Sequence, residues 1–542
     1  MAEYDVVVVG GGHNGLTAAV KLALHGARVA VVEATTRLGG LAANYSPWPG
    51  FKAPLGAYVL GLYPRRLMEE LGVAGRVRLI PKEPGMTVLL GGGRALRIYP
   101  DEGRTSREIG RFSEADARAY GEWSRIWRLA GLLLEAVYTH PPASLSDVID
   151  ALERVRRLPL VGDRVLRVVE NTLWAIQAPA SRLLSEFFES EEVRAALVED
   201  AIVGELASPS TPGTSLILAH HYLGSSTGRR GEWAYVEGGM GRLSEVLAER
   251  LRELGGRIYT GLRVRRVVSR GGRAYGVELD DGRVVEARRG VILATSVKIM
   301  PSLLGDSMPE RDVRRVRGLE SRGASAKVIL ALKGGPPRPS RSYQWLKGDL
   351  YRSSVVVMPS LDYAERALAD ALREGMSREP WLSVNVLTDV DPSLAPEGWS
   401  LTSIYLQYAV GGSGWGVEKR RLLLDRVKGV LGDYFSIDWG EAKVDVITPG
   451  DYEALGVPGG HIFHISMRPD QLYANRPLPG VGYKLPWLEG LYIASASAHP
   501  GGGVTGLPGL LAAEALLADA GVVKPRRLNI ASLAERAVRG II

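Results

Sequence analysis

Cysteine is absent from the 542-residue sequence. This absence excludes disulfide bonds, thiolate metal ligands, a thiol nucleophile and any CxxC redox pair. Electrons that the protein moves must therefore be carried by a bound cofactor and not by its own thiols. Glutamine occurs only four times, and arginine greatly outnumbers lysine. Because thermolabile residues are scarce in thermophilic proteins, we expect a thermophilic source.

Long uncharged runs are also scarce in this chain. The longest, residues 490–513, is too rich in glycine and proline to cross a bilayer as a helix. The N-terminus enters a strand-like run at once, without the basic and apolar regions of a secretory signal. These observations predict a cytoplasmic protein that lacks a transmembrane helix.

Positive charge is in excess but diffuse. The net charge is +7, and no nucleic-acid motif, P-loop, G-x-S-x-G elbow or HExxH motif accompanies it. We therefore expect no nucleic-acid partner and no hydrolase activity. One segment, residues 151–176, combines five arginines with apolar residues at helical spacing and a tryptophan. It fits either peripheral contact with a membrane or a helix of the protein core with its arginines in water.

A βαβ pattern occupies the first 33 residues. An apolar run over residues 4–9 is followed by Gly10, Gly12 and Gly15 in G-x-G-x-x-G spacing, then by a helical pattern and a second strand that ends at Glu33. Such glycines let a pyrophosphate approach the helix N-terminus, where free N–H groups favour an anion. Glu33 can accept hydrogen bonds from ribose hydroxyls, which a 2′-phosphate would prevent. The pattern predicts FAD or NAD rather than NADP, whereas a tight turn without a ligand is the alternative.

A second glycine pair follows this unit. Arg37, Gly39 and Gly40 form Arg-x-Gly-Gly directly after the second strand. This supplies another close backbone approach, which domains that bind only a nicotinamide dinucleotide do not usually require. The motif favours FAD, and a flexible surface turn is the other interpretation.

The dinucleotide-binding parts are divided along the chain. The fold class that we predict is α/β, with a discontinuous Rossmann-like FAD-binding domain of parallel sheet and helices, plus a mixed α+β substrate domain. The FAD-binding domain is assigned to 1–90, 227–296 and 482–520. The substrate domain, with a helical insertion, is assigned to 91–226 and 297–481, and 521–542 is a C-terminal tail.

Four stretches, spread over the chain, carry a family resemblance. They are VVVGGGHNGLTAA from Val7, GEWAYVEGGMGRLSEVLA from Gly231, GGHIFHISMRPDQLYANRPLP from Gly459, and GLYIASASAHPGGGVTGLPG from Gly490. In these stretches the chain resembles the phytoene desaturase-like flavoproteins, in particular a branch named for pyridine nucleotide-disulfide oxidoreductase domains. Disulfide chemistry is excluded by the missing cysteines.

The resemblance implies an FAD site made from both ends of the chain. Residues expected on the ADP side are Gly10, Gly12, His13, Asn14, Gly15, Glu33, Arg37, Gly39, Gly40, Val264 and Ala294. Those expected beside the flavin ring and ribityl chain are Gly501, Gly502, Gly503, Val504 and Thr505. Many flavoproteins have an aspartate after the last strand, but here Ala494, Ser495 and Ser497 stand near that place. Hydroxyls or backbone N–H groups must then supply the polar contact.

Two residues are candidates for catalysis. His499 stands at the mouth of the last glycine-rich loop, where a neutral imidazole could act as a base or donate to the flavin, or only shape the loop. Lys327 lies in a predicted strand and could hold a water near the flavin, as in some flavin amine oxidases, although a solvated lysine at a strand edge is commoner. We predict structural roles for His220 and His221, and no metal site at His461 and His464. His464 falls on one of the family stretches, so a role on the substrate side is open for it beside a structural one.

The implied activity is hydride transfer between the flavin N5 and a C–C bond of an apolar substrate, an isoprenoid or another lipid. Saturation, the reverse reaction, stays open, and oxygen or a quinone is expected as electron acceptor. Two alternatives remain. One is an amine-oxidase-like enzyme that acts on a C–N bond, and the other is a flavin-stabilised interaction protein with little turnover. The oligomeric state is not predicted.

Overall fold

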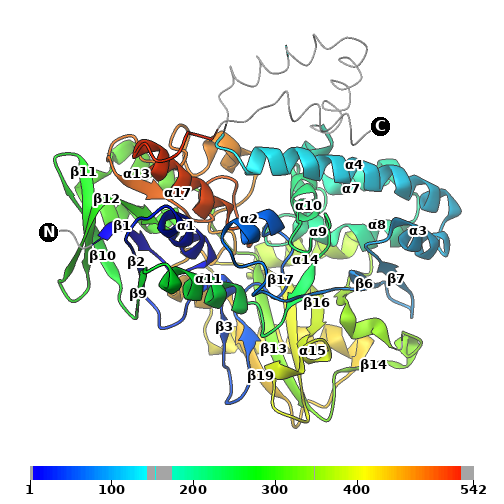
Figure 1. Cartoon of the computed structure of the whole chain (residues 1–542). Helices are drawn as coiled ribbons and strands as arrows, with labels where there is room; N and C mark the ends of the chain where they lie inside the picture. The colour runs from blue at the N-terminus through cyan, green and yellow to red at the C-terminus, as the bar shows by residue number, and fades with distance from the viewer. Residues whose placement is uncertain (1–3, 143–152, 154–173, 347, 527–542) are drawn as a thin grey trace.

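The computed structural model describes residues 4–142, 153, 174–346 and 348–526, and two seven-stranded sheets organise them (Figure 1). The first sheet has the strand order β10-β11-β12-β1-β2-β9, and β20 pairs with β12 on the side opposite β1. Its strands are β1 (Tyr4–Val9), β2 (Val29–Glu33), β9 (Arg257–Thr260), β10 (Val264–Arg270), β11 (Arg273–Leu279), β12 (Val284–Leu293) and β20 (Leu491–Ile493). A hairpin at Asp281 and Gly282 joins β11 to β12.

The centre of this sheet is parallel and fully buried. β1 pairs in parallel with β2 and β12, and all six of its residues are buried. This burial explains its valine run, because a parallel strand is covered on both faces. Helix α1 (His13–Leu24) packs against α11 (Arg242–Glu253) and α17 (Leu507–Asp519), which lie on either side of it (Figure 1).

The second sheet is mainly antiparallel and has the order β19-β13-β17-β16-β15-β6-β7, with β15 and β6 parallel. Its strands are β6 (Met86–Leu89), β7 (Ala95–Ile98), β13 (Ser325–Lys333), β15 (Ser354–Val357), β16 (Met376–Val386), β17 (Trp399–Ala409) and β19 (Lys443–Ile447). Helices α14 (Leu361–Glu374) and α15 (Val417–Tyr434) pack against β16. The strand predicted around Lys327 is β13.

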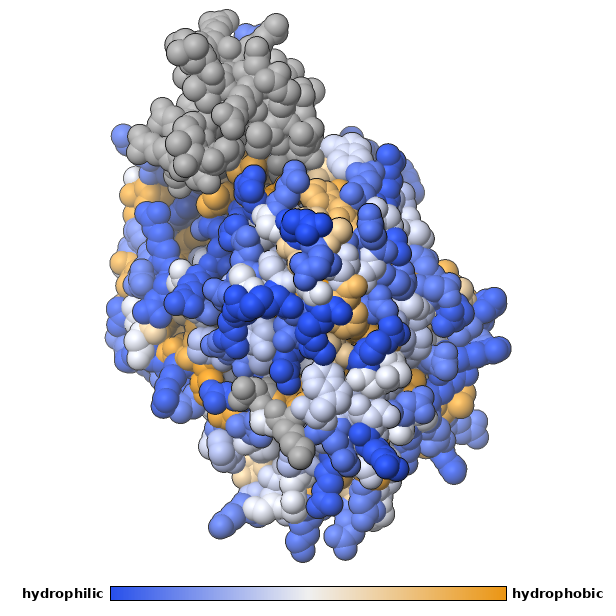
Figure 2. Space-filling view, turned by 90° about the vertical axis from the view of Figure 1, so that its right-hand side faces the viewer, coloured by the Kyte–Doolittle hydropathy of each residue, from blue (hydrophilic) through white to orange (hydrophobic). Residues whose placement is uncertain are grey.

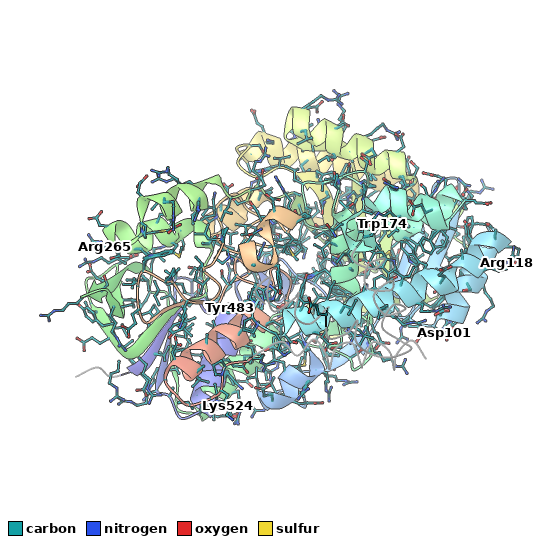
Figure 3. The ribbon with its side chains drawn as sticks, turned by 90° about the horizontal axis from the view of Figure 1, so that it is seen from above. Asp101, Arg118, Trp174, Arg265, Tyr483 and Lys524 are labelled. Atoms are coloured by element: carbon teal, nitrogen blue, oxygen red, sulfur yellow. The ribbon has the colours of Figure 1, made fainter. Side chains whose placement is uncertain are left out.

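A helical region lies beyond β7 in the chain. Its longest helix, α4 (Glu114–Tyr138), buries Trp123 and Trp127, and the side chain of Ser113 caps its N-terminus. Arg118 on this helix and Arg265 on β10 mark opposite ends of the molecule (Figure 3). The other helices of this region are α3 (Glu102–Gly110), α7 (Ala180–Phe187), α8 (Glu191–Leu197), α9 (Glu199–Ile202) and α10 (Thr214–Tyr222).

Shorter elements complete the described part. The remaining helices are α2 (Arg65–Glu70), α12 (Met300–Leu304), α13 (Glu310–Gly318) and α16 (Pro449–Ala454). The remaining strands are β3 (Asn44–Tyr45), β4 (Ala53–Pro54), β5 (Leu79–Pro81), β8 (Ala234–Val236), β14 (Arg338–Pro339) and β18 (Phe435–Ser436). None of the described helices combines the length and apolarity needed to cross a membrane.

The discontinuous α/β fold class is confirmed, because three separated parts of the chain supply the first sheet. One strand belongs to the other sheet from the one that the predicted domain boundaries imply. β6 lies inside the segment 1–90, yet it pairs with β15 and β7 of the second sheet. Most of the segment 151–176, where peripheral membrane contact was considered, lies outside the described residues. The face in Figure 2 is largely hydrophilic, with scattered hydrophobic patches.

Candidate functional site

A continuous cavity of about 510 Å³ runs from the β1–α1 turn into the helical region. At one end it is lined by the glycine-rich turn and Glu33, and at the other by Tyr99, Tyr120 and Ser124 of the α3–α4 region. Residues of the second sheet, among them Ser354 and Tyr405, line the part between. The cavity is therefore bounded by the first sheet, the second sheet and the helices together.

The glycines of the β1–α1 turn bring strand and helix into close contact. A Cβ atom at Gly15 would lie 2.1 Å from the carbonyl oxygen of Gly10, so no larger residue fits without a shift. Gly10 has a φ of +106°, which other residues rarely adopt. No side chain caps the N-terminus of α1 at Gly12. The first-turn N–H groups are left to an anion that enters the cavity, as a pyrophosphate would.

Glu33 is held at the end of β2 by the neighbouring backbone. Its Oε2 accepts a hydrogen bond from Gly11 N at 2.8 Å, and its Oε1 accepts from Thr35 N at 2.8 Å. The N–H of Leu262 donates to the carbonyl of Glu33 at 3.0 Å, which brings Val264 to the same end of the cavity. A carboxylate so oriented keeps acceptor capacity for ribose hydroxyls.

The Arg-x-Gly-Gly motif packs on the glycine-rich turn. Gly39 N donates to Gly11 O at 2.8 Å, and both Gly39 and Gly40 have positive φ. Arg37 lines the cavity beside them. This second close approach is the one that the sequence analysis attributed to FAD.

Only part of the last glycine-rich loop, residues 497–509, lines the cavity. Gly503 and Val504 line it, together with Ala294 from the end of β12 and Ala496, which precedes the loop. Gly501 and Thr505 are buried outside the lining. Gly502 is covered by Phe463, since a Cβ there would lie 2.1 Å from the Phe463 ring.

The serines near the end of β20 are committed to the backbone. Ser497 Oγ accepts from Val297 N at 3.0 Å, and Ser495 Oγ accepts from Ser497 N at 3.1 Å. Neither serine is among the residues that line the cavity. Main-chain groups would then supply the polar contact that an aspartate makes in many flavoproteins.

Three histidines, one of them buried and two half-buried, line the cavity next to this loop. They are His13, His220 and His464, and each has at least one ring nitrogen without a hydrogen-bond partner among the described residues. Burial lowers the pKa of His13 to about 4 and that of His464 to about 3, so both rings are neutral at pH 7. Their unpaired nitrogens are available to a ligand. The sequence analysis gave His220 a structural role and left a substrate-side role open for His464.

His499 does not line the cavity. Its Nε2 lies 3.0 Å from the carbonyl of Val137, and its ring packs edge-on against Tyr138 and Tyr473. Its own carbonyl accepts a hydrogen bond from the hydroxyl of Tyr483 at 3.1 Å. This placement favours the second role considered for His499, which is to shape the loop.

Lys327 is buried, so the expectation of a solvated lysine at a strand edge is wrong. β13 is an interior strand that pairs with β17 and β19, and Lys327 is 1% exposed. Its Nζ donates to Gly56 O at 2.7 Å and lies 4.9 Å from the ring centre of Tyr58, and burial lowers its pKa well below the ordinary value. Gly56 and Tyr58 line the cavity, so Lys327 supports its wall.

Together, the uncapped helix N-terminus, the fixed carboxylate of Glu33 and the unpaired histidine nitrogens fit FAD: the phosphates at the β1–α1 turn, the ribose at Glu33 and the flavin beside Gly503. When bound, FAD supplies two-electron transfer at its flavin ring. Among the described residues, no group of three or more His, Asp or Glu side chains could hold a metal ion. The fold and this site define an FAD-dependent oxidoreductase.

Comparison with known proteins identifies the family. The chain belongs to the flavin-containing amine oxidoreductases, whose family model matches residues 15–373. It is 32% identical to pyridine nucleotide-disulfide oxidoreductase domain-containing protein 2 of Mus musculus, over 95% of this chain and 94% of that protein. It is 25% identical to a lycopene-forming phytoene desaturase of Pseudescherichia vulneris, over 92% of this chain and 96% of that protein.

A solved structure shares the fold. A mutant of putrescine oxidase superposes with a TM-score of 0.54 at 16% identity, covering 95% of this chain and 98% of that chain. At this identity the likeness concerns the fold alone. Relatives named as desaturases and a structural neighbour named as an amine oxidase therefore both occur, and the substrate is not determined by them.

Proposed function

We propose that the protein transfers a hydride between the flavin N5 and a C–C bond of an apolar substrate, an isoprenoid or another lipid. In the oxidising direction, two neighbouring carbons each lose a hydrogen, one as hydride and one as a proton, and a C=C bond forms. Oxygen or a quinone then takes the two electrons. The walls of the cavity bind and orient the substrate carbon and exclude water.

The reach of the cavity is the observation that carries this proposal. Beyond the cofactor cradle it continues past Leu41, Leu55, Met86 and Ile98 to the α3–α4 region. The apolar part of this wall suits a long hydrocarbon more than a small amine, while Glu102, Ser124 and Arg128 line the far end. The cavity also continues from the cofactor cradle to the α3–α4 region. This continuity argues against the alternative of an interaction protein in which the flavin is sealed from substrates.

The geometry of the aromatic rings weakens the amine-oxidase alternative. Tyr58 and Tyr405 both line the cavity, but their centroids are 6.3 Å apart and their planes are tilted by 42°. They contact each other instead of facing across a slot in which an amine could lie. One feature still favours an amine, because the carboxyl groups of Glu199 and Asp200 line the cavity and would attract an ammonium.

Anaerobic reduction of the flavin tests the proposal. The purified holoenzyme is mixed with isoprenoid hydrocarbons, long-chain lipids or small amines, and its visible absorption is followed. Bleaching by the isoprenoids or lipids is expected, and re-oxidation with oxygen or a quinone then identifies the acceptor. Bleaching by amines alone would replace the proposal with the amine-oxidase alternative. A flavin that no candidate bleaches, in a protein that retains FAD, would support the interaction protein.

A further inference from the structure

Several charged side chains line the cavity away from the cofactor cradle. Glu102 pairs with Arg128, Arg230 with Glu135 and Glu232 with Arg229, whereas three others form no ion pair among the described residues. These three are Lys82, which follows β5, and Glu199 and Asp200, which begin α9. Lys82 is 7% exposed and Glu199 is 5% exposed. A charge buried to this extent is costly unless it is paired or binds something, so these residues require an explanation that an all-hydrocarbon substrate does not give.

The Lys82 side chain is held in place, but its ammonium does not use all of its hydrogen-bond donors. Its backbone N–H donates to the carbonyl of Trp233 at 3.0 Å, which fixes the chain beside β8. Its Nζ donates to Ser354 Oγ at 2.9 Å, and this hydroxyl in turn donates to Asn385 at 2.8 Å. Among the described residues no other hydrogen bond or ion pair of this ammonium occurs. Two of its three N–H groups therefore remain for a ligand.

Glu199 and Asp200 bring two carboxyl groups to the same cavity and form no ion pair with Lys82 among the described residues. Burial, together with the charge of Asp200, raises the pKa of Glu199 well above its ordinary value. Both carboxylates act on Lys82 through their charge, while burial lowers the pKa of Lys82 to about 8, so that it is mostly protonated at pH 7.

The chemistry of these side chains indicates the occupant. The wall presents an ammonium and carboxyl groups together, so either a cationic or an anionic ligand group would face a like charge in a buried site. An uncharged oxygen does not. A hydroxyl can accept from Lys82 and donate to a carboxyl oxygen, and a carbonyl can accept from Lys82.

We propose that Lys82, Glu199 and Asp200 form a subsite that binds an uncharged oxygen function, a hydroxyl or a carbonyl, on an otherwise apolar substrate. This inference rests on the proposed function, because it refines the class of apolar substrate. The subsite lies in the same cavity as the apolar walls, with Tyr58 beside Glu199. It therefore holds one end of the molecule, while the apolar walls hold the rest.

Binding to the oxidised holoenzyme tests the subsite without turnover. The probes share one chain length: octane, octanol, a dialkyl ketone, octylamine and octanoate. Their affinities are measured from the perturbation of the flavin absorption bands. In a wholly apolar cavity octanol would bind more weakly than octane, because its hydroxyl would lose water without a partner. We expect the reverse order, with octanol or the ketone bound most tightly, and the better of the two distinguishes a hydroxyl from a carbonyl substrate.

Substitution of the ammonium sharpens the test. Lys82→Met should lower the preference for octanol over octane by about tenfold or more, since a hydrogen bond to a charged group is lost. Lys82→Arg should preserve the order. Lys333→Met, the same change at an exposed lysine that ends β13, is the matched control and should change nothing. If Lys82→Met yields no holoenzyme, the wild-type order and Lys82→Arg still decide.

Several results would overturn the subsite. They are an octane affinity equal to or above that of both octanol and the ketone, a tightest binding by octylamine or octanoate, or an unchanged preference in Lys82→Met. Failure of the proposed function appears elsewhere, in anaerobic flavin reduction by amines alone or by no candidate. The two failures are thus distinguishable, because the ranking of these probes requires no C–H bond to break.

Discussion

Replacement of Arg476 is expected to separate the chain at Ala496, after β20, from residues 463–471, which pack against it. Arg476 is fully buried, and its guanidinium donates to the carbonyl of Ala496 from both Nε and Nη2, at 3.0 and 2.7 Å. The same group donates to four carbonyls of one neighbouring segment, those of Phe463, Ile465, Ser466 and Gln471. Ala496 and Phe463 both line the cavity, so this one side chain ties two of its walls together.

The magnitude follows from the carbonyls that lose a partner. In Arg476→Met five carbonyls lose this donor, and only that of Ser466 keeps another, from Gln471 Nε2. Four buried carbonyls without partners cost about 1–3 kcal/mol each. The sum, about 4–12 kcal/mol, is comparable with the whole stability of a typical protein. We expect no folded flavoprotein from this variant.

Arg476→Lys is the quantitative test. An ammonium has three N–H groups, so at least one of the four carbonyls that depend on Arg476 stays unpaired, which costs about 1–3 kcal/mol. Flavin content and thermal unfolding followed by flavin fluorescence should both decrease. Arg468→Lys is the control, because Arg468 pairs with Asp470 on the exposed side of the same segment. Equal unfolding temperatures and equal flavin content in Arg476→Lys and wild type would refute the reasoning.

Three further outcomes are expected. Gly502→Val should displace Phe463, because even a Cβ would lie 2.1 Å from its ring, and the purified variant should retain little flavin; normal flavin content would show that the loop adapts. Stability should fall as the pH drops below about 6.5, by up to about 1.4 kcal/mol per pH unit for each histidine of depressed pKa, because the unfolded chain then binds protons that His13 and His464 do not. Thermal unfolding between about pH 7.5 and pH 5 measures this, and a flat profile would contradict it. Lys327→Met should destabilise the wall at Tyr58 and lower the rate of flavin reduction, which stopped-flow absorbance measures; an unchanged rate would leave Lys327 a purely structural residue.

The cofactor end of the site was predictable because its signals are local. The strand, turn and helix over residues 4–24 depend on neighbours in the sequence, and so does the carboxylate of Glu33 that ends the next strand. Glycines that lie against another part of the backbone could also be recognised in the sequence, because the residue type itself is the signal. Gly15 and Gly39 stand where a Cβ would collide, and no other residue could occupy those places.

Lys327 shows where local information ends. The strand over residues 325–333 was recognisable from its apolar run, but its place within the sheet was not. β19 pairs with it from residues 443–447, and this pairing turns an apparent edge into an interior strand. A lysine at an edge is ordinarily solvated, whereas the same lysine between two strands must find buried acceptors, here the carbonyls of Pro54 and Gly56.

The far end of the cavity depends on contacts between distant segments, and this is why sequence reasoning missed it. Lys82 and Glu199 are 117 residues apart in the chain, and each alone looks like an ordinary surface charge. One local signal did exist, since Glu199 and Asp200 interrupt an apolar helical stretch, AALVEDAIV, where two adjacent acids have no evident reason to be. Side chains that break a buried pattern in this way carry a cost in stability, so they are the residues in which a substrate preference should be sought first.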